Sequence, residues 1–141
     1  TPDGKRPGIF YIPLPDPTKF NVTSGMESLF LHEAIPGHHY QISLQQENMS
    51  LPKFMRFGWF GAYGEGWAHY CETLGSEFGL YTDPYQKMGY LSDQMLRAVR
   101  LVVDTGLHTG KMTREEAIDY FLKKRWKLLF CKLSKILRNK I

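Results

Sequence analysis

The residues best suited to chemistry lie in one short stretch, His-Glu-Ala-Ile-Pro-Gly-His-His, from His32 to His39. Three of the five histidines of the chain lie here, and Glu33 directly follows the first of them. The pattern approaches the His-Glu-x-x-His helix of zinc peptidases, in which the histidines bind the metal. The glutamate of such a helix polarises a water molecule at the metal. The stretch therefore predicts a metal site with hydrolytic chemistry.

The spacing leaves the second histidine ligand open between His38 and His39. On a regular helix, residue i+7 returns to within roughly 20° of residue i, whereas i+6 lies roughly 240° away, so the helical wheel favours His39. Pro36 removes one helical hydrogen bond and Gly37 loosens the next step, so we expect a bulge at this point. Two extra residues in a bulge would bring His38 to the place that i+4 holds in a regular helix. These residues alone do not decide between the two.

A second group of polar side chains lies on the next predicted helix. Glu65, His69 and Glu72 are spaced i, i+4 and i+7, so they share one helix face. No lysine or arginine lies between Arg56 and Lys87, so local charge pairing does not explain these acidic residues. A bound metal would explain them.

The elements that must position these groups are mainly helices. Ser24 and Glu27 predict a capping box at the start of the first helix, and Thr113 and Glu116 predict another before the last one. Residues 9–12, bounded by prolines, predict a short edge strand above a cleft, or else a surface arm. The expected helices run from about 25 to 48, from about 65 to 79, from about 84 to 106, and from 114 onward.

The third predicted helix carries a line of charged residues at three- and four-residue steps: Arg97, Arg100, Asp104 and His108. Arg100 and Asp104 are expected to form an ion pair. The line is either a solvated helix face or the wall of a cleft that binds the anionic end of a substrate.

Length and charge limit the class of protein. The chain has 141 residues, 43% of them hydrophobic, which suits at most one domain with a real core. It has no apolar run long enough for a transmembrane segment, and its two cysteines make no disulfide framework. Residues 123–141 contain eight Lys/Arg and no acid, so the net charge of +4 leaves −4 for residues 1–122. We therefore expect a metal-binding region at 1–122 and a basic amphipathic helical tail at 123–141, packed on the core.

Four stretches of the sequence form one ordered set of motifs: Arg6-Pro-Gly-Ile-Phe-Tyr11, the His32 stretch through Tyr40-Gln41, Gly64-Glu-Gly-Trp-Ala-His-Tyr70, and Arg97-Ala-Val-Arg-Leu-Val-Val-Asp-Thr-Gly-Leu-His108. Taken together, these motifs resemble the DUF885 family over roughly residues 5–121. The resemblance ends after Tyr120-Phe121. The sequence itself looks like a fragment of a longer helical protein.

The resemblance implies a large, mostly helical protein related to zincin metallopeptidases, with a gluzincin-type site. Its ligands would be His32, His38 and Glu65, because the histidine after the glycine matches the corresponding one in related carboxypeptidases. Glu33 would take the water-activating role.

We therefore expect a zinc-dependent hydrolase of peptide bonds, with Glu33 as general base. His69, Arg100 and His108 are the candidate donors to the oxyanion. The alternative is a catalytically incomplete fragment, a binding module stabilised by a structural metal with His39 or His69 as fourth ligand. We expect a peptide substrate and no nucleic-acid partner. The peptide, the compartment and the oligomeric state cannot be read from the sequence.

Overall fold

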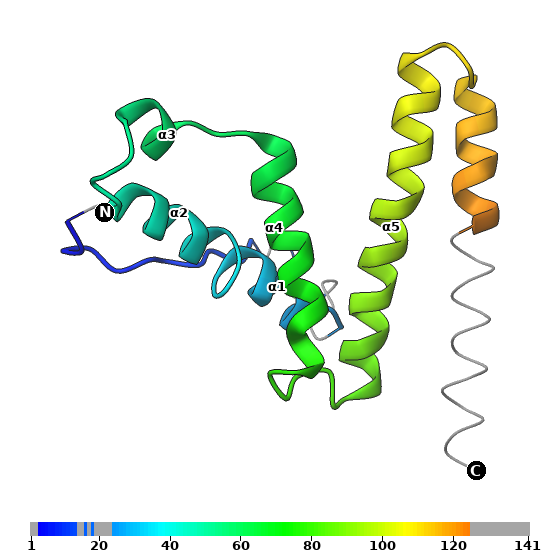
Figure 1. Ribbon diagram of the computed structural model, residues 1–141. Helices are drawn as coiled ribbons and strands as arrows, with labels where there is room; N and C mark the ends of the chain where they lie inside the picture. The colour runs from blue at the N-terminus through cyan, green and yellow to red at the C-terminus, as the bar shows by residue number, and fades with distance from the viewer. Residues whose placement is uncertain (1–2, 14–15, 17, 19–23, 125–141) are drawn as a thin grey trace. The chain divides into compact units, whose positions relative to one another are not determined.

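The computed structural model describes residues 3–13, 16, 18 and 24–124, and within these ranges the chain is mainly helical (Figure 1). This confirms the predicted fold class at the level of helix content. The elements are α1 (Met26–Glu33), α2 (His38–Glu47), α3 (Lys53–Phe57), α4 (Gly61–Thr73), the 3₁₀ helix η1 (Leu74–Ser76) and α5 (Pro84–His108).

The expected edge strand at residues 9–12 is not formed. A strand needs a second strand to exchange backbone hydrogen bonds, and none of the described residues is in a strand. The segment is instead an extended arm with exposed side chains at Ile9, Tyr11 and Ile12. Phe10 attaches the arm to α1 through an edge-to-face contact with Phe30, at 6.3 Å between ring centroids.

The predicted helix over residues 25–48 is two helices, because residues 34–37 leave the helical path. Ala34 has ψ −107° and Gly37 has ψ −140°, and the Ile35–Pro36 peptide bond is cis. The returning backbone passes so close to α1 that a Cβ at Gly37 would lie 1.9 Å from the carbonyl oxygen of His32. Only glycine fits such an approach. Trp67 on α4 fastens the loop, because its Nε1–H donates to the carbonyl of Pro36 at 2.7 Å.

The predicted capping box at Ser24 and Glu27 is also wrong. Gly25 is the N-cap residue, with φ 85° and no side-chain hydrogen bond. The Glu27 carboxylate accepts instead from the backbone N–H of Tyr81, 2.6 Å away. A contact between residues 54 positions apart has therefore replaced the local cap.

The chain divides into two compact units, Thr1–Lys87 and Met88–Ile141. In the first unit, α1 packs against α4, and α2 packs against α3 and α4. The centre of this unit is unusually polar: beside Leu31, Ala68 and Cys71, it buries Glu72 completely. A buried carboxylate is costly unless it is paired, so its partners matter to the whole unit.

The second unit contains most of α5 and a further helical segment at residues 114–124. Among the described residues of this unit, Val99 and Ala117 are buried apolar side chains. The predicted capping box is confirmed here: Glu116 accepts from the backbone N–H of Thr113 at 2.8 Å, and the Thr113 hydroxyl accepts from the N–H of Glu116 at 3.2 Å.

None of the helices in the described part of the chain is long and apolar enough to cross a membrane. Of the basic tail predicted at 123–141, residues 125–141 lie outside the described residues. The predicted boundary between 122 and 123 stays a prediction.

Candidate metal centre

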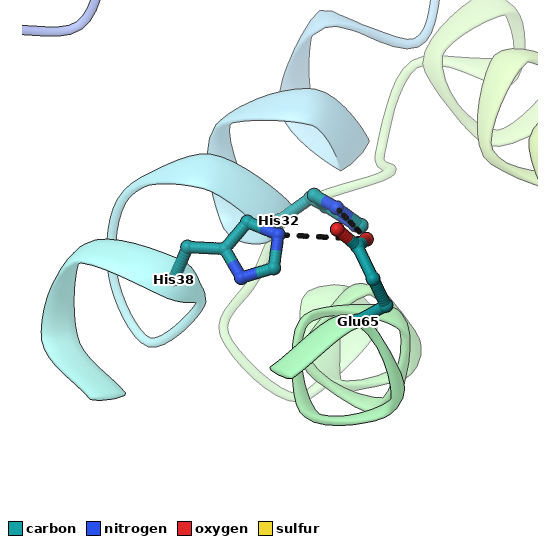
Figure 2. A group of neighbouring side chains, drawn as sticks. All are labelled: His32, His38 and Glu65. Atoms are coloured by element: carbon teal, nitrogen blue, oxygen red, sulfur yellow. Dashed lines mark ion pairs between the residues drawn. The ribbon is translucent and has the colours of Figure 1, made fainter. Parts of the chain in front are cut away.

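His32, His38 and Glu65 point toward one another in the first unit (Figure 2). One Glu65 oxygen lies 3.4 Å from Nε2 of His32 and 3.6 Å from Nε2 of His38. The two imidazole rings meet nearly at right angles, with centroids 4.7 Å apart. One ligand atom from each of the three residues lies within 4.8 Å of the others.

Three helices supply these groups. His32 lies in the last turn of α1, His38 begins α2, and Glu65 lies in the first half of α4. His38 reaches His32 because the loop at residues 34–37 folds back on α1, as Gly37 permits. The structure thus brings His38, and not His39, to the group, as the bulge hypothesis expected.

His32 is buried, and one of its ring nitrogens contacts the carboxylate of Glu72. The His32 side chain is 8% exposed, and its Nδ1 lies 2.7 Å from Oε1 of Glu72. The other oxygen of Glu72 accepts from the hydroxyl of Ser28 at 3.2 Å. Because Nδ1 faces Glu72, Nε2 is the nitrogen of His32 that faces Glu65 and His38.

His38 has a different environment, with its side chain 14% exposed. Trp59 lies edge-on against its ring, at 5.5 Å between centroids. Its Nδ1 is buried and has no hydrogen-bond partner among the described residues. Nε2 is the nitrogen that it presents to Glu65.

The separations between the Glu65 oxygen and each of the two histidine nitrogens suit a tetrahedral ion. Ligands that each lie roughly 2.0–2.1 Å from zinc are separated by about 3.3 Å from one another. The observed 3.4 and 3.6 Å are close to this value and longer than a good N–H···O bond. Two imidazoles and a carboxylate are a donor set typical of zinc. The residues present therefore fit a zinc ion.

The other histidines lie outside this group. The His39 ring packs on the backbone of Gly8, where a Cβ would come within 2.6 Å of it. It lines a small hollow with the arm residues Arg6 and Pro7. His69 is half-buried on α4, one turn beyond Glu65, and does not join the three donors.

Glu33, the predicted base, is the last residue of α1 and directly follows His32. It is half-buried and is not one of the three donors. Its part in chemistry stays a prediction.

The remaining candidates, Arg100 and His108, belong to the second unit and are exposed. The expected ion pair between Arg100 and Asp104 is wrong, because Asp104 pairs with His108 at 3.4 Å. His108 also bonds the carbonyl of Asp104 through the same Nδ1, at 2.8 Å. One turn of helix brings these two residues together, so the contact is local. The proposed role of Arg100 and His108 as oxyanion donors stays a prediction.

Sequence reasoning grouped Glu72 with Glu65 and His69 on one helix face but gave it no role of its own, although the structure places it against His32. The signal was present: Glu72 stands seven residues after Glu65 on one helix face, in a stretch without local cations. What was missing is the partner, because Ser28 and His32 lie more than 30 residues away in the chain.

An apolar cavity of about 490 Å³ lies beside α2, between side chains of α2, α3 and α4. Its lining includes Trp67, which holds the loop before His38, and Gln41, one turn after His38. The helix that carries His38 therefore borders apolar space as well as the histidine–glutamate cluster.

The described helices and the His–His–Glu cluster define a helical protein with a candidate metal centre. The chain belongs to the DUF885 family, bacterial proteins of unknown function, whose profile matches residues 1–127. This confirms the family expected from the four motifs.

A solved structure, "the putative lipoprotein from Colwellia psychrerythraea", is 44% identical over 91% of this chain, with a TM-score of 0.77. The chain spans 23% of that protein's chain. No curated protein matches the sequence.

Proposed function

We propose that this chain carries the metal centre of a zinc-dependent hydrolase of peptide bonds, related to the zincin metallopeptidases, with His32, His38 and Glu65 as ligands. The observation that carries the proposal is a set of three donors, without a fourth His, Cys, Asp or Glu among the described residues. Structural zinc sites are usually closed by four protein ligands, whereas catalytic sites use three and leave a position for water or substrate. Both candidates for a closing ligand, His39 and His69, lie outside the group.

The exposure of the group also supports a catalytic role. The side chains of His32 and His38 are 8% and 14% exposed, whereas that of Glu65 is 61% exposed. The histidines are therefore held in place by packing, and the group is open to solvent on the side of Glu65. A substrate needs such an opening, and a purely structural site does not.

We assign Glu33 the role of general base. A glutamate next to a ligand histidine can take the proton of the attacking water and pass it to the leaving amine. A zinc ion held by His32, His38 and Glu65 would lower the pKa of a water molecule to about 7 and would polarise the substrate carbonyl. His69, which lies on α4 in the same unit as the three donors, is the proposed donor to the oxyanion.

The test measures zinc content and peptide hydrolysis together, on the wild-type chain and on Glu33→Gln. Elemental analysis should find one zinc per chain in both proteins, because Glu33 is not a ligand. Hydrolysis of a broad peptide panel should fall by about 10²–10⁴-fold in Glu33→Gln. Glu47→Gln, at an exposed glutamate on α2, is the matched control and should leave both unchanged. A metal-free wild type, or unchanged hydrolysis in Glu33→Gln, would contradict the proposal.

The second candidate function is a metal-stabilised binding module. It is favoured by the short span of the chain, which is 23% of the length of the relative from Colwellia. The groups that bind substrate in a whole protein of this family would then lie outside residues 1–141. A wild-type chain that holds one zinc and cleaves no peptide of the panel is the outcome expected from this candidate.

A further inference from the structure

We infer that Glu72 is a positioning residue for the metal centre: its buried carboxylate holds the His32 imidazole so that Nε2 presents its lone pair to the metal. This inference rests on the proposed zinc site. Glu72 would not touch the metal, and it would act through His32. The step needed is a hydrogen bond from Nδ1–H of His32 to Glu72.

The first support is the geometry of the hydrogen bond. Nδ1 of His32 lies 2.7 Å from Oε1 of Glu72, which is short for an N–H···O bond and typical of one that a carboxylate accepts. With Glu72 as the acceptor of this hydrogen bond, the proton is on Nδ1. The neutral ring then has its lone pair on Nε2, the nitrogen that faces Glu65 and His38. Histidine ligands in metal sites are commonly fixed in this way.

The second support is the burial of the carboxylate. Glu72 is 0% exposed and is the largest fully buried side chain among the described residues. An ionised carboxylate at such depth needs compensating charge or hydrogen bonds. A cation on the far side of the His32 ring would supply that charge through the imidazole.

The third support is that the carboxylate is itself held in place. The Ser28 hydroxyl donates to Oε2 of Glu72, so both oxygens are engaged. Tyr81 donates its hydroxyl to the backbone carbonyl of Glu72 at 2.8 Å. The Tyr81 backbone has φ 61°, a left-handed conformation uncommon for a large side chain, and its N–H bonds Glu27. Contacts from three segments therefore fix the position of Glu72.

A merely structural role would give a different outcome. If Glu72 only filled the core and paired with His32 for stability, its loss would destabilise the fold and leave zinc affinity of the folded protein unchanged. The deciding quantity is therefore the dissociation constant for zinc, measured by competition with a chromophoric chelator below the unfolding temperature. Thermal unfolding of the metal-free proteins measures stability separately.

Three variants test the inference. Glu72→Met keeps the approximate size and removes the acceptor, so zinc affinity should fall by about 10- to 100-fold. Glu72→Gln keeps an oxygen acceptor and should recover part of the loss. Ser28→Ala removes only the hydroxyl that holds the carboxylate and should weaken zinc binding by about two- to tenfold. Should Glu72→Met fail to fold, Glu72→Gln and Ser28→Ala still carry the test.

Cys71→Ala is the matched control, because Cys71 is also 0% exposed and is the preceding residue on α4. It should lower the unfolding temperature without changing zinc affinity. A double-variant cycle completes the test: in a His32→Ala background, Glu72→Met should weaken zinc binding little further, since the effect passes through His32.

The outcomes separate the inference from the proposed function. A wild-type chain that binds no zinc refutes the metal centre and the inference together. A wild-type chain that binds zinc, with Glu72→Met and Ser28→Ala binding as tightly, overturns the role of Glu72 and leaves the proposed function intact.

Discussion

His38 and His39 are adjacent in the sequence and lie in different surroundings. His38 is largely buried, with its ring against Trp59 and its Nε2 near Glu65. His39 is exposed and packs on the arm at Gly8. Consecutive residues of a helix point about 100° apart, so one of the pair must leave the site when the other enters it.

Replacing each of these histidines by alanine tests which one binds zinc. His38→Ala should weaken zinc binding by more than the roughly 10- to 100-fold typical of residues that only support a ligand, because it removes a ligand. His39→Ala should keep the wild-type dissociation constant. Equilibrium dialysis followed by elemental analysis measures both. The reverse pattern would show that His39 is the ligand and that the regular helical wheel describes the bound state.

At the scale of elements, the loop at residues 34–37 decides how α1 and α2 meet. The loop passes close to α1 at Gly37. A Cβ at Gly37 would collide with the backbone of His32 and would lie 2.3 Å from the carbonyl oxygen of Leu31. Backbone atoms cannot rotate away as a flexible side chain can. The loop therefore depends on the absence of a Cβ at one position.

Gly37→Ala should consequently destabilise the first unit and weaken zinc binding. Forcing extra atoms into a packed site costs typically about 1–3 kcal/mol, and backbone contacts place this site at or above that range. Gly66→Ala is the control, since a Cβ at Gly66 meets nothing within 4 Å. In the interior of α4 it should stabilise the protein by up to about 1 kcal/mol. Chemical unfolding of both variants provides the comparison; equal stability of the two would show that the loop adapts.

The cap of the helical segment at 114–124 gives a pH-dependent prediction. Hydrogen bonds from Thr113 lower the pKa of the Glu116 carboxyl below its ordinary value. The bond from the backbone N–H of Thr113 contributes most, and the bond from its hydroxyl contributes less. A lowered pKa in the folded state means that the stabilisation is present above the ordinary pKa. This stabilisation is lost as the pH falls from the ordinary pKa of a glutamate side chain through the lowered pKa of Glu116 in the folded state. Helix content of this segment should decrease over that interval.

NMR titration of the Glu116 side-chain carboxyl measures this directly. In Thr113→Ala the pKa of Glu116 should rise toward its ordinary value, because the hydroxyl no longer contributes. Thr109→Ala is a suitable control, since its hydroxyl donates to the carbonyl of Thr105 at 2.7 Å and leaves the cap alone. An unchanged pKa of Glu116 in Thr113→Ala would leave the backbone N–H as the whole cause.

At the scale of the whole molecule, the proposed zinc ligands and Glu72 all lie between residues 32 and 72, within the first unit. Truncation after Tyr120 should therefore leave the zinc dissociation constant within about twofold of wild type, because the removed residues include none of the proposed ligands. The apolar stripe of the removed tail is expected to cover hydrophobic surface, so the unfolding temperature or the solubility should fall. Calorimetry and zinc competition on the truncated chain check the two expectations. Loss of zinc on truncation would show that the tail closes the site.

Sequence patterns determined the helical class, the family, the capping box at Thr113 and Glu116, and the residues that could bind a metal. These features depend on local chemistry or on spacing within one helix. Hydrophobic periodicity also predicted a helix from about 84 to 106, and α5 spans Pro84–His108. Local signals failed where a residue distant in the sequence competed for the same group. The Glu27 carboxylate accepts a hydrogen bond from the backbone N–H of Tyr81 and does not form the expected capping box.

The resemblance already named His32, His38 and Glu65 together, but only the tertiary structure showed how they meet and that Glu72 lies against His32. The break at residues 34–37 brings His38 to His32, and the packing of α1 on α4 brings Glu65 and Glu72 to the two nitrogens of the same ring. Helix propensity carries no information about such contacts, because residues 32 and 72 are forty positions apart. Their approach is set by which faces of α1 and α4 are buried against each other, and burial makes the Glu72–His32 hydrogen bond necessary.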